Sequence, residues 1–246
     1  MANDIRTDYF PGKYKKSRPT LSKMVDRYVR EWEMRKTFEK DEAKKAPELT
    51  HYISISRKIG VGALEIADIL SERIGRQVVD REIMEHIAKS RDLRATTVDY
   101  FDERYPGRLN EFALLMFGEK AFTMGDYMRQ LANTVIRIAE TGPAIFVGRG
   151  THLILPREKV LAVRFICSTE NRIKRVADIM KIGEADAAKV LEKEDKLQRD
   201  FFKKNFARKD ALPYEFDFVI NRDYFPDAHW AASIIEKAYR LKFNVS

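Results

Sequence analysis

Three things are scarce or missing in this chain of 246 residues: cysteine, long apolar runs and a complete phosphate-loop motif. The single cysteine, Cys167, lies in an apolar run, which favours a small buried thiol over a nucleophile or a metal ligand. No apolar run reaches the roughly 18 residues of a membrane span, and the first residues lack the apolar core of a signal peptide. These absences predict a cytoplasmic protein that does not enter a membrane. The pattern GxxxxGK[ST] occurs nowhere, so a phosphate loop of the ordinary kind is excluded.

Positive charge is present in excess but is spread along the chain. The 46 Lys plus Arg and 38 Asp plus Glu give a net charge of +8. Residues 1–50 hold 13 of the cations and 9 of the anions, a net of +4, which leaves +4 for the rest. No block of five or six consecutive cations marks a nucleic-acid tail. Charge alone is therefore weak evidence for either a nucleic-acid surface or a site for highly charged phosphates.

The chain divides near residue 50. A polar stretch at residues 41–50 separates an N-terminal extension, residues 1–50, from a main domain, residues 51–246. Within the extension, Leu21, Val25 and Trp32 follow helical spacing and predict one amphipathic helix. We expect this helix to pack on the main domain; pairing with a second chain in a homodimer is the alternative. The basic run from Lys13 to Arg18 fits solvated charge at a chain terminus, and a nucleic-acid contact is the alternative.

Beyond residue 50, short apolar segments alternate with helical patterns. Helices are predicted from about residue 63 to Gly75, directly after Asp80, and over residues 127–140. Residues 91–130 look mostly helical and are rich in aromatic side chains. Five strands are predicted, at about residues 52–55, 77–80, 144–147, 161–167 and 217–220. This alternation predicts an α/β fold with three αβα layers and a mainly parallel five-stranded sheet, whose site lies at the carboxyl edge.

A turn with two glycines follows the first predicted strand. Gly60 and Gly62 stand between that strand and a helix that begins near Ala63. Such a turn would let backbone N–H groups and the helix N-terminus face phosphate groups. An ordinary strand-to-helix turn explains two glycines equally well.

Four segments that are distant in the sequence should meet at the same edge of the sheet. They are the glycine turn at residues 56–62, Asp80 with Arg81, residues 148–150 around Arg149, and residues 168–175. Arg149 lies between two glycines after a buried strand, where a guanidinium suits bidentate phosphate binding better than packing. Asp80 fits a helix N-cap as well as a substrate or Mg²⁺ role. His152 fits a packing or surface role better than that of a general base.

Taken in order, these segments resemble the cytidylate kinase-like proteins, which are relatives of the P-loop nucleoside monophosphate kinases. The resemblance rests on ISRKIGVGALEIA, VVDREIMEHIA, FVGRGTHLIL, STENRIKRVADIM and EKEDKLQRDFFKKNF, and it covers about residues 52–240. It implies a P-loop NTPase-like fold and phosphoryl transfer from ATP, with Mg²⁺, to CMP or a related pyrimidine monophosphate. It also implies a helical acceptor-binding region at residues 91–130 and a mobile basic lid at residues 181–210.

The resemblance also implies roles for individual residues. The phosphates of the nucleotide would be bound by the first loop: Ser56, Arg57, Lys58, Gly60, Val61, Gly62, Ala63 and Leu64. The acceptor would be bound by Asp80, Arg81, Arg149 and Asp195. The lid would contribute Arg172, Arg175, Lys196 and Arg199, and the catalytic cations would be Arg149, Arg175, Lys196 and Arg199. The metal ligands are left open. A solvated helix surface explains Arg172 and Arg175 as well, and an ordinary amphipathic helix explains residues 192–209.

The first loop departs from the usual motif at two positions. Aligned on the two glycines, Ala63 stands where a lysine is usual and Leu64 where a metal-binding Ser or Thr is usual. The kinase-like relatives tend to lack the lysine, but the missing hydroxyl puts the metal arrangement in doubt. Arg57 and Lys58, directly ahead of the glycines, would restore positive charge from the other side of the loop.

Three functions follow from these observations. The first is a nucleotide kinase; the second is a catalytically weakened nucleotide-binding or regulatory protein, which Ala63 and Leu64 favour. The third is a dinucleotide-binding enzyme, because Gly60, Gly62 and Asp80 mimic part of that fingerprint. Glu65 occupies the position of the third glycine in that fingerprint, however, so this function ranks last.

Overall fold

The computed structural model describes residues 50–89, 125–208 and 210–245, together with Lys23, Val25 and Arg30. Most of the predicted acceptor-binding region and of the N-terminal extension therefore lies outside the described residues. Val25 is helical and buried in the same apolar cluster as Tyr52 and Phe146. At this residue the extension packs on the main domain, whereas a role in a homodimer stays a prediction.

A five-stranded parallel sheet forms the centre of the molecule. The strands are β1 (Tyr52–Arg57), β2 (Gln77–Asp80), β3 (Ala144–Val147), β4 (Val160–Ile166) and β5 (Phe218–Asn221). Their order is β2-β3-β1-β4-β5, and every neighbouring pair is parallel. The predicted α/β class and all five predicted strands are confirmed, with small shifts at some ends. β1, at the middle of the sheet, is buried along its whole length.

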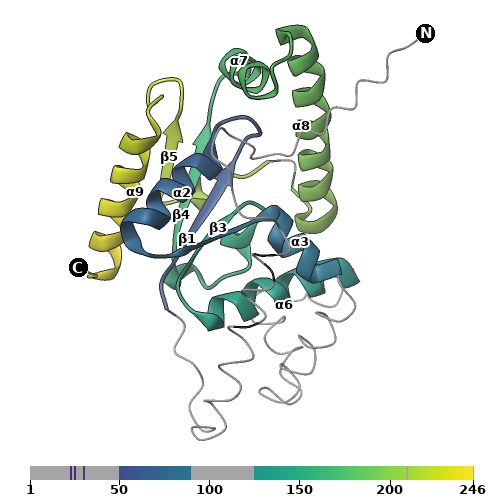
Figure 1. Ribbon diagram of the computed structural model, residues 1–246. Coiled ribbons are helices and arrows are strands. Elements are labelled where there is room, and N and C mark those ends of the chain that lie inside the picture. The colour runs from purple at the N-terminus through teal and green to yellow at the C-terminus, as the bar shows by residue number, and fades with distance from the viewer. Residues whose placement is uncertain are drawn as a thin grey trace, which may run out of the picture.

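Helices cover both faces of the sheet (Figure 1). α2 (Ala63–Ile74) and α9 (Ala228–Phe243) pack on one face, and α3 (Arg81–Lys89) and α6 (Asp126–Thr141) lie on the other. The side chains of β1 alternate between the two cores: Ile53 and Ile55 join the α2 side, while Tyr52 joins the α6 side. The three predicted layers follow from this alternation, since each face of a buried sheet must be covered.

A pair of helices extends past the carboxyl ends of the strands. α7 (Thr169–Met180) begins at Ser168, whose side chain accepts a hydrogen bond from the N–H of Asn171, and α8 (Glu184–Phe206) follows it. The two helices pack through a third apolar cluster, which includes Ile59 from the loop after β1. Most of the predicted lid is thus one continuous helix, and in Figure 1 it runs down one side of the molecule from the level of α7 to that of α3.

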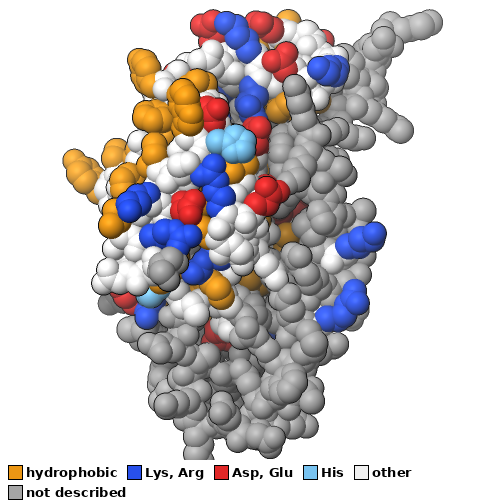
Figure 2. Space-filling model, turned by 60° about the vertical axis from the view of Figure 1, so that its left-hand side comes forward, with side chains coloured by type: hydrophobic (Ala, Val, Ile, Leu, Met, Phe, Trp, Pro, Cys, Tyr) orange, Lys and Arg blue, Asp and Glu red, His pale blue; other side chains and the backbone are white. Residues whose placement is uncertain are grey.

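Short turns and helix ends complete the described chain. Gly75 ends α2 with φ 63°, as the sequence predicts, and Gly142 ends α6. Single 3₁₀ turns occur at Thr151–Leu153, Arg157–Lys159 and Pro213–Glu215. No helix within the described ranges is long and apolar enough to cross a bilayer. The face seen in Figure 2 carries basic and acidic side chains side by side, and hydrophobic side chains gather along one margin.

His152 is a buried packing residue, as the sequence favours. Its ring lies 4.6 Å from that of Phe216, and its Nε2 lies 3.2 Å from a carboxylate oxygen of Glu215. Burial lowers the pKa of His152 from 6.5 to about 4, although the hydrogen bond to Glu215 opposes this change. The folded protein therefore holds the neutral imidazole.

This burial predicts a loss of stability in acid. As the pH falls from about 6.5 to about 4, the unfolded chain binds a proton that the folded chain does not, so the free energy of unfolding falls. We expect His152→Gln to remove about 1–2 kcal/mol of that loss between pH 7 and pH 4.5. Urea unfolding at the two pH values measures it. His86→Gln, at an exposed histidine, is the control variant. An equal pH dependence of the free energy of unfolding in the wild type and in His152→Gln would contradict the prediction.

Candidate functional site

The loop between β1 and α2 has the backbone geometry of an anion-binding turn. Gly60 and Gly62 have φ of 82° and 77°, and Gly62 caps α2 without a side-chain hydrogen bond. Within the described chain, the N–H groups of residues 59–62 donate no hydrogen bond to another backbone group. Positive φ at alternate residues and unused N–H groups at a helix N-terminus are features of phosphate-binding loops.

The two residues that depart from the usual motif are buried. Ala63 and Leu64 belong to the apolar cluster between the sheet and α9 and are 2% and 6% exposed. The first turn of α2 therefore supplies neither a cation nor a hydroxyl at these positions. Arg175 from α7 lies against Gly62 instead: a Cβ built on Gly62 would lie 2.6 Å from its Nη2. Arg175 also forms an ion pair with Glu65.

Arg149 is held in a conformation that few arginines adopt. It has φ 54° and stands between two glycines with φ of 92° and 69°, so three consecutive residues are left-handed. Its guanidinium lies over the ring of Phe201, 4.1 Å from the centroid, and pairs with Glu85. Burial, followed by repulsion from Arg81 and Arg57, lowers the pKa of Arg149 from its ordinary value to about 9. Burial and the neighbouring cations disfavour the charged form of Arg149, and a bound anion would stabilise that form.

Asp80 ends β2 and Arg81 begins α3, close to Arg149. Asp80 Oδ1 accepts hydrogen bonds from the N–H groups of Glu82 and Ile83 at 3.0 and 3.1 Å, which is the N-cap geometry of α3. Arg81 lies 3.8 Å from carboxylate oxygens of both Glu85 and Glu194. The N-cap role of Asp80 is thus present, whereas its contact with a substrate stays a prediction.

Arg172 links the loop to the lid helix. Its Nη1 donates to the carbonyl oxygen of Ile59 at 3.2 Å and to both carboxylate oxygens of Asp195 at 3.0 and 2.9 Å. The side chain is buried, so the solvated helix surface that the sequence allowed for Arg172 is wrong. Asp195, which the resemblance assigns to the acceptor, pairs here with Arg172, and its contact with an acceptor stays a prediction.

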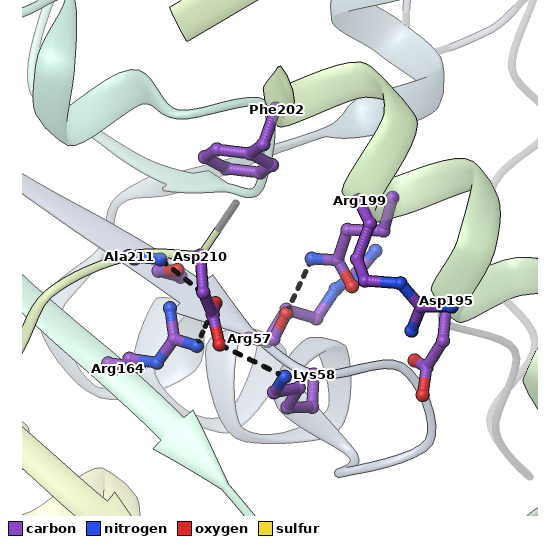
Figure 3. A pocket seen from close by; sticks show the side chains of 10 residues that line it. Arg57, Lys58, Arg164, Asp195, Arg199, Phe202, Asp210 and Ala211 are labelled. Atoms are coloured by element: carbon purple, nitrogen blue, oxygen red, sulfur yellow. Dashed lines mark hydrogen bonds and ion pairs between the residues drawn. The ribbon is translucent and has the colours of Figure 1, made fainter. Parts of the chain in front are cut away.

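A pocket opens beside the loop, below α8 (Figure 3). Lys58 and Arg164 both bind Asp210, with N–O distances of 3.2 and 2.7 Å. Arg199 also reaches this pocket. Ten residues line it: Ser56, Arg57, Lys58, Arg164, Asp195, Gln198, Arg199, Phe202, Asp210 and Ala211. Four of these are cations and two are carboxylates, so the pocket favours an anion.

The predicted cations fall into two groups around the loop. Arg57, Lys58 and Arg199 line the pocket, and Arg149 lies close enough to Arg57 for the two charges to repel. Arg172 and Arg175 lie against the loop itself, at Ile59 and Gly62. The exposed Lys196 has no hydrogen bond or ion pair with any described residue.

Several arginines carry a buried Nε that no described residue binds: those of Arg149, Arg172 and Arg175. A buried polar atom without a partner is costly, so an added acceptor is expected nearby. Phosphate oxygens satisfy this need, and the residues present therefore fit the triphosphate of ATP. Mg²⁺ fits less well, because the described residues contain no group of three His, Cys, Asp or Glu side chains that would hold a metal ion. Mg²⁺ would then be bound mainly by phosphates and water.

The sequence reasoning missed residues that the tertiary structure brings to the site. Arg164 lies inside β4, which reads as a continuous apolar run, and an arginine within such a strand was the available signal. Gln198, Asp210 and Glu85 gave no signal, since each acts through a partner at least 46 positions away.

Comparisons with known proteins give a family for the chain and a solved structure of similar fold. The model of the cytidylate kinase-like family matches residues 52–224. A crystal structure of an uncharacterized protein from Eubacterium ventriosum is 20% identical and has a TM-score of 0.57, over 77% of this chain and 98% of that chain. Shikimate kinase from Bacteroides thetaiotaomicron is 11% identical, with a TM-score of 0.38, over 79% of this chain and 99% of that chain. No curated protein matches the chain.

Proposed function

The chain belongs to the cytidylate kinase-like family, and on that premise we propose that it transfers the γ-phosphoryl group of ATP to CMP or a related pyrimidine monophosphate. An oxygen of the acceptor phosphate attacks the γ-phosphorus, the bond to the β–γ bridging oxygen breaks, and ADP leaves. This chemistry needs charge compensation and alignment more than covalent help.

One observation carries the proposal. At the carboxyl edge of one parallel sheet lie N–H groups of the glycine loop and arginine Nε atoms that have no partner among the described residues. In the proposed reaction, the loop and Arg175 bind the phosphates of ATP, and Arg81 and Arg149 bind the acceptor phosphate. Lys196 and Arg199 on α8 neutralise the transferring group when the helix closes.

A catalytically weakened nucleotide-binding protein is the second candidate, and specific contacts favour it. Ala63 and Leu64 are buried in the core, and carboxylates of the same chain already pair with Arg149, Arg172 and Arg175. Nucleotide would then bind without rapid transfer. The dinucleotide-binding alternative has less support, because β3 lies between β1 and β2 here, whereas these two strands are neighbours in the dinucleotide fold.

A substrate panel separates these functions. We expect ADP release with ATP and Mg²⁺ to be faster with CMP or dCMP than with UMP or AMP, at about 1–100 turnovers per second for the best acceptor. A coupled assay measures release, and calorimetry measures ATP binding separately. Binding without turnover on any acceptor selects the weakened protein. Absence of ATP binding contradicts both candidates.

The remaining partners and the location also stay proposals. Nucleotides are the partners that the family implies, and we propose a cytoplasmic location. A nucleic-acid contact or a homodimer through the N-terminal helix draws no support from the described residues.

A further inference from the structure

Three side chains hold the carbonyl groups of the glycine loop, one at every second residue. Gln198 donates to Arg57 O at 2.8 Å, Arg172 to Ile59 O at 3.2 Å, and Arg222 to Val61 O at 3.3 Å. The donors come from α8, from α7 and from the turn after β5. We call these three side chains the carbonyl brace.

The brace also fixes the direction of N–H groups. A peptide unit is planar and trans, so the carbonyl of one residue and the N–H of the next point in opposite directions. Binding the carbonyls of Ile59 and Val61 therefore turns the N–H groups of Gly60 and Gly62 away from the two arginines. The Lys58 N–H, which follows the carbonyl held by Gln198, donates to Phe165 O at 3.2 Å.

The side chains of the loop strengthen this arrangement. Ile59 packs among α7 and α8, while Val61 packs in the core beneath α2, and both are 2% exposed. Alternate residues thus bury an apolar side chain and have their carbonyl bound. Gly60 and Gly62, which lie between and after them, have the positive φ that an anion-binding turn needs.

From this arrangement we infer that Gln198, Arg172 and Arg222 are positioning residues that orient the N–H groups of the loop toward the phosphates. Through Gln198, this orientation depends on the packing of α8 against the loop. The inference rests on the proposed function and deepens it. Gln198 and Arg222 do not need to contact the nucleotide for this role. Closure of the lid would then tighten phosphate binding through the backbone as well as through lid cations.

Gln198 is the cleanest residue to test. Arg172 also binds Asp195 and Thr169, and Arg222 also binds the carbonyls of residues 225–227, so replacing either one disturbs other contacts. Among the described residues, Gln198 has a single hydrogen bond, the one to Arg57 O. Gln198→Met keeps the length of the side chain and removes the donor. Leu197→Met, at the exposed neighbouring position, is the matched control.

Two measurements test the inference, both on the full chain. The first is the affinity for inorganic tripolyphosphate by calorimetry, which we expect Gln198→Met to weaken by roughly three- to tenfold, the effect of one hydrogen bond. The second is hydrogen exchange at Lys58 without ligand, which we expect to become faster. Leu197→Met should change neither. Gln198→Glu, which places a carboxylate against the carbonyl, should weaken binding further.

The outcomes separate the brace from the proposed function. Unchanged exchange at Lys58 and unchanged affinity in Gln198→Met overturn the inference while the proposed function stands. A lower melting temperature with unchanged affinity overturns it too, because the residue would then act only in folding. If the wild type binds neither tripolyphosphate nor ATP, the proposed function fails and the inference fails with it.

A second pair of variants examines geometry without a change of charge. Arg222→Lys keeps the cation but loses the Nε donor that reaches Val61 O. We expect weaker tripolyphosphate binding than in Arg240→Lys, because the Arg240 side chain pairs with Glu236 on the surface of α9 and with no other described side chain. Equal affinity in the two variants would count against the brace.

Discussion

Arg149→Ala is expected to lower kcat by about 10²- to 10³-fold, with the acceptor that the substrate panel selects. The guanidinium is buried beside Arg81 and Arg57, and its Nε has no partner among the described residues. Phosphate oxygens developing charge in the transition state would supply that partner. Steady-state kinetics on the purified variant measure the loss. Arg149→Lys should lose less, since it keeps the charge but not bidentate binding.

The control for this variant is an arginine at the amino-terminal ends of the strands, opposite to the proposed site. Arg157 precedes β4 and pairs with Asp217 at 2.7 Å, so Arg157→Ala also removes an arginine that has a carboxylate partner. We expect kcat to stay unchanged there. Circular dichroism should show that Arg149→Ala is folded. A folded Arg149→Ala variant with wild-type kcat would remove Arg149 from the catalytic residues.

Gly62→Ala is expected to weaken the binding of ATP and of tripolyphosphate at least about tenfold. Two effects combine, because φ is 77° and the new methyl group would lie 2.6 Å from Arg175 Nη2. The left-handed backbone alone costs about 1–2 kcal/mol of stability for a residue with a Cβ. The contact also displaces Arg175 from its position against Gly62, which removes one cation from the phosphate-binding loop.

Gly75 separates the two effects of that substitution. It has φ 63°, and a Cβ there meets nothing within 4 Å, so Gly75→Ala carries the backbone cost without the contact. Both variants should lose similar stability in thermal unfolding, and only Gly62→Ala should lose affinity by calorimetry. Equal affinity in the two variants would show that the position of Arg175 does not matter for binding.

Much of the fold could be predicted from the sequence because it depends on local patterns. Apolar runs such as residues 144–147 mark buried strands, Gly75 marks the end of α2, and Asp80 marks the start of α3. The glycine loop and Arg149 could be chosen as site candidates for the same reason, since each stands directly after a strand. The order of the strands could not, because pairing between distant segments leaves no local pattern.

The sequence by itself determined that the chain forms an α/β domain with glycine and arginine residues at the carboxyl ends of its strands, since residue periodicity and strand ends are local properties. Only the tertiary structure decided what those residues contact. It places Arg175 against Gly62, Arg172 between the loop and Asp195, and Gln198 on the carbonyl of Arg57. Each of these contacts joins residues 23 to 141 positions apart, and charges and hydrogen bonds act over a few ångströms of space, whatever the separation along the chain.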